Sequence, residues 1–389
     1  MKLITRSYSL LGFFLAFFFI LLILLWSASS FIKYIDFSLY NSLRDQIRVF
    51  RTENLRPNQK YRFTELHPQF TEVDVNSLIR VKDIKTSKNS RRNLLNVIWN
   101  DPNIRYNLLP NNYINIDKNK IHTIQKIDKS ELIKNIEEIH FSGKNDFFSK
   151  SYHFTPKKRN GSLILFHSGN TGSFLKYMAS IIKFLEEGYD VLAFSMWIID
   201  KQPEISVAGS GTIKFRDHSF LKFISEPLRI YFDPVIAGLN YLTQKNDYEN
   251  IVAIGFSGGG WVVTVLSAFD QRINFSYPIA GSYPLYLRRF RNWSTWQETY
   301  PPLLEAANYL DLYLMASEGK ERRQVQVLNK YDGCCYSGIG WTTYASIIRD
   351  ISMKLDGNGW DIYIDESHAD HKISSQAIEF ILNDIKKNK

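Results

Sequence analysis

The sequence has few cysteines, only two in 389 residues, and these two, Cys334 and Cys335, are adjacent. This number and spacing exclude a disulfide framework and the paired-cysteine pattern of a zinc site. Because a bond between neighbouring cysteines is rare, we expect two reduced, mostly buried thiols. The hydrophobic content of 44% is ordinary for a globular protein, so the chain has enough apolar residues for a large core.

An acidic excess is also absent, because 48 Lys and Arg outnumber 39 Asp and Glu and give a formal charge of +9. The basic residues are scattered or form small clusters, at 157–159, 288–291 and 386–387. None of these clusters interleaves with aromatic residues as in a nucleic-acid-binding module, so nucleic acid is not an expected partner. The surplus predicts a solvated basic surface, or one suited to an anionic membrane or envelope polymer.

Charge is missing entirely from residues 8–32, which are almost all apolar. About 20 such residues cross a bilayer as a helix, and Trp26 lies where an interfacial aromatic residue is expected. We therefore predict that residues 1–32 are an uncleaved transmembrane signal anchor. A cleaved signal peptide with Lys2 and Arg6 as its basic region is the alternative. Basic residues flank both ends, but a short tail before a single span usually stays in the cytoplasm, which predicts an extracytoplasmic soluble domain.

Residues 33–149 are polar, contain few glycines and carry no recognisable chemistry. We interpret them as a membrane-proximal linker and an N-terminal extension that packs on the later domain. Short helical patterns occur at 38–49 and 129–139.

From residue 150 onward, apolar strands alternate with amphipathic helices, which predicts an α/β domain with a mostly parallel sheet flanked by helices over 150–389. Aromatic and arginine residues at 281–320 indicate an insert that could cap a site. Strands are expected at 150–154, 162–166, 190–194, 251–254, 273–278, 324–328 and 360–364, and helices at 173–187, 227–243, 261–268, 342–354 and 374–386.

The motif with most chemical meaning is Gly-Phe-Ser-Gly-Gly at 255–259, between an apolar strand and an apolar helix. This is the context of a nucleophilic serine, Ser257, held on a sharp strand-to-helix turn. The residues two before and two after the serine crowd each other, so we expect glycine to be required at 255 and 259. A structural turn or an inactive site is the alternative interpretation.

With this strand order and this turn, residues 150–389 resemble the α/β-hydrolase superfamily, in which an acid and then a histidine follow the serine along the chain. The resemblance implies that Asp332, just after the expected strand 324–328, is the acid. Asp365, directly before the last histidines, is the reserve candidate.

The base is expected in the loop after the last strand, which contains both His368 and His371. The sequence His-Lys-Ile-Ser at 371–374 looks like the histidine-bearing tail of carboxylesterases, so we prefer His371 and keep His368 as the alternate base. A histidine pair with acids nearby could also bind a metal, but no convincing third ligand is evident.

The oxyanion hole is expected where the loop after strand 162–166 meets the start of the helix that follows Ser257. That loop, from His167 through Gly172, resembles the family's His-Gly loop. Its candidate donors are the backbone N–H groups of Ser168, Gly169 and Asn170, together with that of Gly258.

These residues predict a membrane-anchored serine hydrolase that cleaves a small-molecule, lipid or glycan-linked ester through an acyl-enzyme intermediate. No metal or organic cofactor is implied. A catalytically silent binding or scaffold protein of the envelope, and a serine peptidase or amidase, remain as alternatives that the fold alone does not separate.

Overall fold

The computed structural model describes residues 37–54, 60–117, 131–144, 147–170, 172–199, 204–207, 211–215, 217–288 and 295–389. The predicted signal anchor at 1–32 lies outside these ranges. Within them, no helix combines the length and the apolar composition that crossing a bilayer requires.

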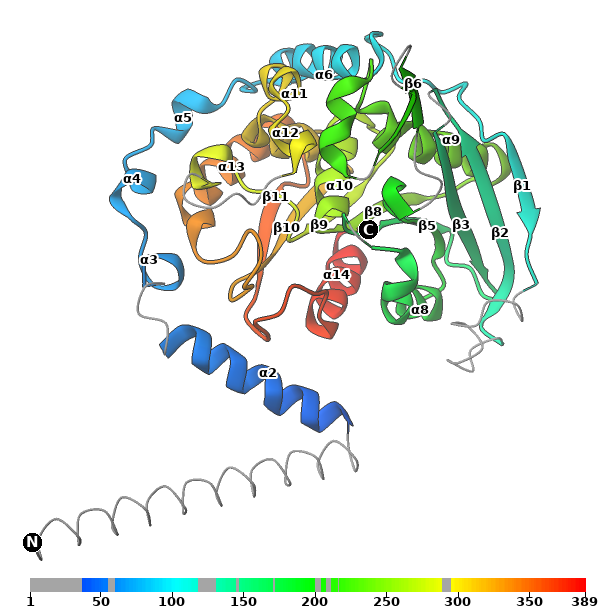
Figure 1. Cartoon of the computed structure of the whole chain (residues 1–389). Coiled ribbons are helices and arrows are strands. Elements are labelled where there is room, and N and C mark those ends of the chain that lie inside the picture. Colours follow the sequence, from blue (N-terminus) through cyan, green and yellow to red (C-terminus); the bar gives the residue numbers. More distant parts are fainter. Residues whose placement is uncertain are drawn as a thin grey trace, which may run out of the picture.

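A nine-stranded sheet in the order β1-β2-β3-β5-β4-β8-β9-β10-β11 runs through the centre of the molecule (Figure 1). Neighbours from β5 to β11 pair in parallel, whereas β1, β2, β3 and β5 pair antiparallel. A separate two-stranded sheet pairs β6 (Glu204–Val207) with β7 (Gly211–Lys214). The strands of the large sheet are β1 (Asn112–Asn115), β2 (Ile133–Ser142), β3 (Phe148–Pro156), β4 (Ser162–His167), β5 (Asp190–Phe194), β8 (Asn250–Phe256), β9 (Phe275–Ile279), β10 (Arg323–Asn329) and β11 (Trp360–Asp365).

Helices cover both faces of this sheet (Figure 1). The described helices are α2 (Phe37–Asn54), α3 (Lys60–Phe63), α4 (Pro68–Thr71), α5 (Val75–Leu78), α6 (Ile84–Trp99), α8 (Met178–Glu186), α9 (Arg229–Lys245), α10 (Gly258–Phe269), α11 (Pro301–Ala306), α12 (Tyr309–Ala316), α13 (Ala345–Ser352) and α14 (Ser375–Asn388).

The core consists of two apolar layers, one on each side of the sheet. In β4, Leu163 and Leu165 belong to the layer shared with α6, α9, α10, α12 and α13, whereas Ile164 and Phe166 belong to the layer shared with α8 and α14. Successive side chains of a strand point to opposite faces, so a continuous apolar run supplies both layers. Helix α10 is buried along its whole length, as its almost wholly apolar sequence requires.

The structure corrects the predicted boundary at residue 150. Strands β1 and β2 both come from the segment interpreted as an extension, yet they form one end of the large sheet. The helix predicted at 129–139 is wrong, because its described part, 131–139, is a turn at 131–132 followed by β2 from residue 133. Helix α2 confirms the pattern at 38–49.

The sequence did not indicate strand β2, because two adjacent glutamates, Glu137 and Glu138, interrupt its apolar pattern. Glu137 of β2 lies 3.1 Å from Nδ1 of the buried His153 in β3, whose Nε2 lies 3.1 Å from Asp190 in β5. Hydrogen bonding to His153 outweighs burial and lowers the pKa of Glu137 to about 2. The ionised Glu137 and its partner His153 therefore link β2 to β3 through a polar contact. A search for hydrophobic periodicity does not detect a strand that is held in this way.

Candidate active site

Ser257 stands on the turn between β8 and α10, with backbone angles of φ 55° and ψ −122°. Residues other than glycine rarely adopt a positive φ, so contacts with the surrounding structure have to hold the backbone of Ser257 in this conformation. The Ser257 N–H donates to the carbonyl of Ile279 in the neighbouring strand at 2.8 Å. A Cβ at Gly255 would lie 2.1 Å from the carbonyl oxygen of Gly259, which confirms that this turn requires glycine at 255.

The loop after β4 approaches the serine closely. A Cβ at Gly169 would lie 3.2 Å from the Cβ of Ser257, and one at Gly258 would collide with the Asn170 side chain. Of the predicted oxyanion residues, Gly169 and Gly258 therefore lie next to the serine, and Asn170 lies next to Gly258. Gly258 is also the first residue of α10, where backbone N–H groups have no acceptor inside the helix.

Ser168 is not a suitable oxyanion donor, which corrects one of the sequence predictions. Its N–H donates to the carbonyl of Phe194 at 3.1 Å, and its hydroxyl bonds the Gly172 carbonyl and accepts the Met196 N–H. These bonds tie the loop to the end of β5. Among the predicted donors from this loop, Gly169 and Asn170 are left as candidates.

Asn170 connects the loop to the insert that was predicted to cap the site. Its Nδ2 donates to Thr295 Oγ1 at 3.4 Å, and Thr295 in turn donates to Glu298 at 3.1 Å. Glu298 is buried, and burial raises the pKa of its carboxyl although Arg288 and three hydrogen bonds lower it. Helix α11 packs beside α6, and α12 against α10, so these parts of the insert belong to the helical layer.

The acid and the base come from the ends of two neighbouring parallel strands, β10 and β11. Because such ends meet at the same edge of the sheet, Asp332 and His371 lie together, with His371 Nδ1 2.5 Å from Asp332 Oδ2. The N–H groups of Cys334 and Cys335 donate to the other carboxylate oxygen at 2.7 and 3.3 Å. The carboxylate is therefore held on both oxygens.

His371 also lies beside the strand that leads to the serine, because its ring centroid is 4.5 Å from that of Phe256. Its side chain is 24% exposed, whereas Asp332 is fully buried. A buried carboxylate that holds a partly exposed imidazole is the arrangement of an acid and base in acyl-transfer enzymes.

His368, the alternate base, has different neighbours. It is completely buried, and its Nε2 lies 3.3 Å from Asp365, the reserve acid. Burial raises the pKa of Asp365, but hydrogen bonds to His368, Ser367 and Ser374 outweigh burial and hold it below its usual value. The two alternates thus pair with each other, away from solvent.

The two cysteines form a disulfide with each other, so the expectation of two reduced thiols is wrong. The turn after Asp332 brings the adjacent side chains together, which sequence alone does not disclose. Their sulfur atoms and a nitrogen of His371 lie within 4.8 Å of one another. This group does not fit a metal ion in the described state, because the bonded sulfurs cannot act as thiolate ligands.

Comparison with known proteins is informative only at the level of structure, because no protein-family model and no curated protein matches the chain. The methylesterase BT1017 is similar with a TM-score of 0.54 and 14% identity, over 84% of this chain and 69% of that one. It belongs to the α/β-hydrolase superfamily. The chain has the α/β-hydrolase fold.

Two further structures are similar with lower scores. The acetyl xylan esterase from Paenibacillus sp. R4 has a TM-score of 0.49 at 13% identity, over 82% of this chain and 100% of that one. The acylaminoacyl peptidase from Pyrococcus horikoshii has a TM-score of 0.46 at 15% identity, over 68% and 43%.

The N-terminal segment adds contacts to this α/β-hydrolase fold that sequence reasoning missed. Arg62 of α3 donates to the carbonyl of Asp332 at 2.5 Å and bonds Ser337. The Ile339 N–H donates to the Arg62 carbonyl at 3.0 Å. A Cβ at Gly338 would lie 2.2 Å from that carbonyl oxygen, so glycine permits this contact. The acid loop is therefore packed against α3.

Helix α2 forms ion pairs with the loop that contains His371. Arg48 pairs with Asp370, and Asp45 lies 2.5 Å from Lys372 Nζ. These two partners are the residues on either side of His371. No local sequence signal could have found these ion pairs, because they join residues 322 and 327 positions apart.

Proposed function

We propose that this protein is a serine hydrolase that cleaves a carboxylic ester through an acyl-enzyme intermediate. The observation that carries this proposal is the pairing of His371 with the buried Asp332 next to Phe256, the last residue of the strand before Ser257. A serine hydroxyl is a weak nucleophile at neutral pH and needs such a base.

The residues then have the following roles. Ser257 Oγ attacks the carbonyl carbon, and His371 accepts the hydroxyl proton while Asp332 stabilises the imidazolium. His371 returns this proton to the alcohol as the carbon–oxygen bond breaks. Water, deprotonated by His371, then attacks the acyl-enzyme, and His371 returns the proton to Ser257 Oγ as the bond between Oγ and the acyl carbon breaks and the acid is released. The N–H of Gly258, with that of Gly169 or Asn170, stabilises the negative oxygen in each step.

We prefer an ester over an amide as the substrate, because BT1017, which has the highest TM-score of the three structures reported above, is a methylesterase by name. We further propose that residues 1–32 anchor the enzyme in a membrane, with the hydrolase domain on the extracytoplasmic side. The uncharged run at 8–32 supports the anchor.

The test is labelling of the full chain with a fluorophosphonate, which reacts with activated serines. We expect the detergent-solubilised wild type to label, Ser257→Ala and His371→Asn to lose labelling, and His368→Asn to keep it. A folded wild type that fails to label would overturn the proposal. Labelling that persists in His371→Asn and disappears in His368→Asn would move the base to His368.

Hydrolysis of p-nitrophenyl acetate and of the matched p-nitroacetanilide then separates an esterase from an amidase. We expect the ester to be cleaved faster, relative to its rate in buffer, than the anilide. The reverse order would contradict ester specificity and leave the activated serine in place.

A further inference from the structure

The loop between β11 and α14 carries His371 between two residues of opposite charge, Asp370 and Lys372. On the domain side, the Lys372 carbonyl accepts a hydrogen bond from Asn329 Nδ2 at 2.9 Å, which ties this loop to the end of β10. The charged side chains of Asp370 and Lys372 have their ion-pair partners in a different part of the chain, helix α2.

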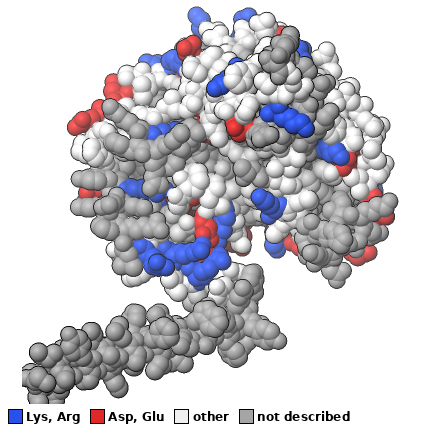
Figure 2. Space-filling view, viewed as in Figure 1, with Lys and Arg blue, Asp and Glu red and all other residues white. Residues whose placement is uncertain are grey.

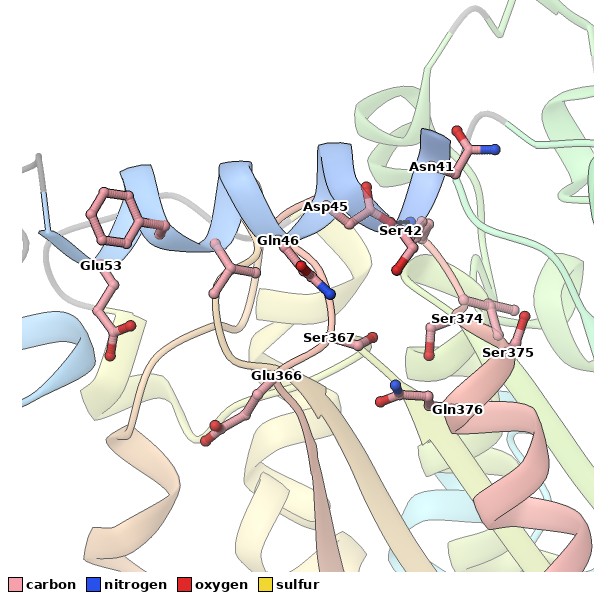
Figure 3. Close-up of a pocket in the computed structure, with 14 residues that line it drawn as sticks. Asn41, Ser42, Asp45, Gln46, Glu53, Glu366, Ser367, Ser374, Ser375 and Gln376 are labelled. Carbon is pink, nitrogen blue, oxygen red and sulfur yellow. Dashed lines mark hydrogen bonds and ion pairs between the residues drawn. The ribbon is translucent and has the colours of Figure 1, made fainter. Parts of the chain in front are cut away.

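Helix α2 crosses this loop and the first turn of α14, with a cavity of about 780 Å³ between them (Figure 3). At the same level, Lys and Arg gather beside acidic side chains in the space-filling view (Figure 2). Asp45 lies 2.5 Å from Lys372 Nζ, whereas Arg48 pairs with Asp370. A shift of the loop that exchanged these partners would bring like charges together, so the two pairs fix the position of the loop on α2.

The loop that contains Asp332 is held by the same part of the chain. Arg62 of α3 donates to the Asp332 carbonyl at 2.5 Å, and it also bonds the hydroxyl of Ser337. That hydroxyl donates to the same carbonyl at 2.8 Å. Before Asp332, the hydroxyl of Tyr331 donates to Glu53 of α2 at 3.2 Å. Helices α2 and α3 therefore contact the loop of the acid and the loop of the base.

These contacts concern geometry more than stability. Lys372 and Asp370 are 34% and 29% exposed, and ion pairs of exposed side chains contribute little to the stability of a protein. The hydrogen bond between His371 and Asp332 is more demanding, because a misplacement of about 1 Å in an active site can lower the rate about 10²-fold. Contacts that matter little for folding can therefore matter much for catalysis.

We propose that Asp45 and Arg62 are positioning residues, which hold the loops of His371 and Asp332 in the arrangement that acid–base catalysis requires. This proposal rests on the proposed function, because it concerns the same reaction. It makes α2 and α3 part of the catalytic unit, although both helices precede the first strand of the sheet.

The test compares Asp45→Lys with Glu226→Lys, both in the detergent-solubilised full chain. Glu226 is a matched control because, like Asp45, it pairs with one lysine and one arginine, Lys144 at 2.6 Å and Arg229 at 3.1 Å. We expect Asp45→Lys to lower kcat for p-nitrophenyl acetate by at least about tenfold, with KM changed less than about twofold. Glu226→Lys should change neither value by more than about twofold.

Rescue variants separate positioning from a general loss of structure. Asp45→Glu keeps the charge and should retain most of the wild-type kcat. The double variant Asp45→Lys with Lys372→Glu restores an opposite pair and should recover much of the kcat lost in either single variant. Arg62→Met should lower kcat as well. Each kcat is expressed per serine that a fluorophosphonate labels to completion, so a misfolded fraction does not count as a slow enzyme.

The outcomes distinguish this proposal from the proposed function. If the wild type cleaves the ester and Asp45→Lys has the same kcat as Glu226→Lys, the positioning role is overturned and the serine hydrolase stands. A change in KM alone, or a double variant no faster than the slower single variant, would also overturn it. A wild type that neither labels nor cleaves the ester would overturn the proposed function, and this proposal with it.

Discussion

Two pairs of aspartate and histidine lie at the same edge of the sheet and have different environments. Asp332 follows β10 and reaches His371 in the neighbouring loop, whereas Asp365 ends β11 and reaches His368 in its own loop. The two histidines are three positions apart in the sequence. His371 is 24% exposed, and His368 is fully buried.

The comparison shows that residue type and strand position do not define a catalytic pair. Only the exposed imidazole can exchange a proton with a substrate. The buried pair has a structural role, because Asp365 also bonds Ser367 and Ser374, and Ser374 caps the N-terminus of α14. In the proposed mechanism one pair serves the chemistry, whereas the other holds the turn that leads into α14.

The largest expected difference between the pairs is in catalysis. Asp332→Asn should lower kcat/KM for the ester by about 10⁴-fold, since an amide stabilises neither the required tautomer nor the imidazolium. Asp365→Asn should change kcat/KM by only a few-fold. Steady-state kinetics on both variants measure this, and similar losses in the two would show that the comparison is wrong.

The second difference is in stability. His368→Asn should lower the free energy of unfolding by about 1–3 kcal/mol, because Asp365 loses a buried partner. His371→Asn should cost less, since its side chain is partly exposed. Urea unfolding of both variants gives the values. A larger loss for His371→Asn would reverse the assignment of the structural pair.

The smallest difference concerns acid stability. The folded state holds the pKa of Asp365 below 3.8, its usual value, so the unfolded state binds more protons. The stabilisation is present above about pH 4 and is lost as the pH falls, with a slope of at most about 1.4 kcal/mol per pH unit. Asp365→Asn should therefore lose stability less steeply than the wild type below pH 4 in pH-dependent urea unfolding. An unchanged slope would contradict this.

Several features of the site were predictable because they depend on short segments. The run from Ile251 to Gly260 defines a strand, a turn and a helix, and the crowding of Gly255 against Gly259 follows from that turn alone. The pairing of Asp332 with His371 was predictable too, because parallel strands bring their carboxyl ends to one edge.

Other features depend on tertiary contacts that no local pattern encodes. The N–H of Ser168 donates to the Phe194 carbonyl, and His368 is fully buried beside Asp365. Likewise, the contacts of Arg62 and α2 with the loops that contain Asp332 and His371 join opposite ends of the chain. The disulfide between Cys334 and Cys335 depends on the turn that follows Asp332.

The contacts of α2 and α3 also constrain the order of folding during synthesis. Arg62 can form its hydrogen bond only after Asp332, 270 residues later, has been synthesised. Asp45 likewise can form its ion pair only after Lys372, 327 residues later, has been synthesised. The ribosome releases the N-terminal segment first, yet its partners emerge near the end of translation. A chain stopped before residue 370 could form much of the sheet but would lack His371 and the partners of α2. The geometry of the site can therefore be completed only when the chain is almost finished.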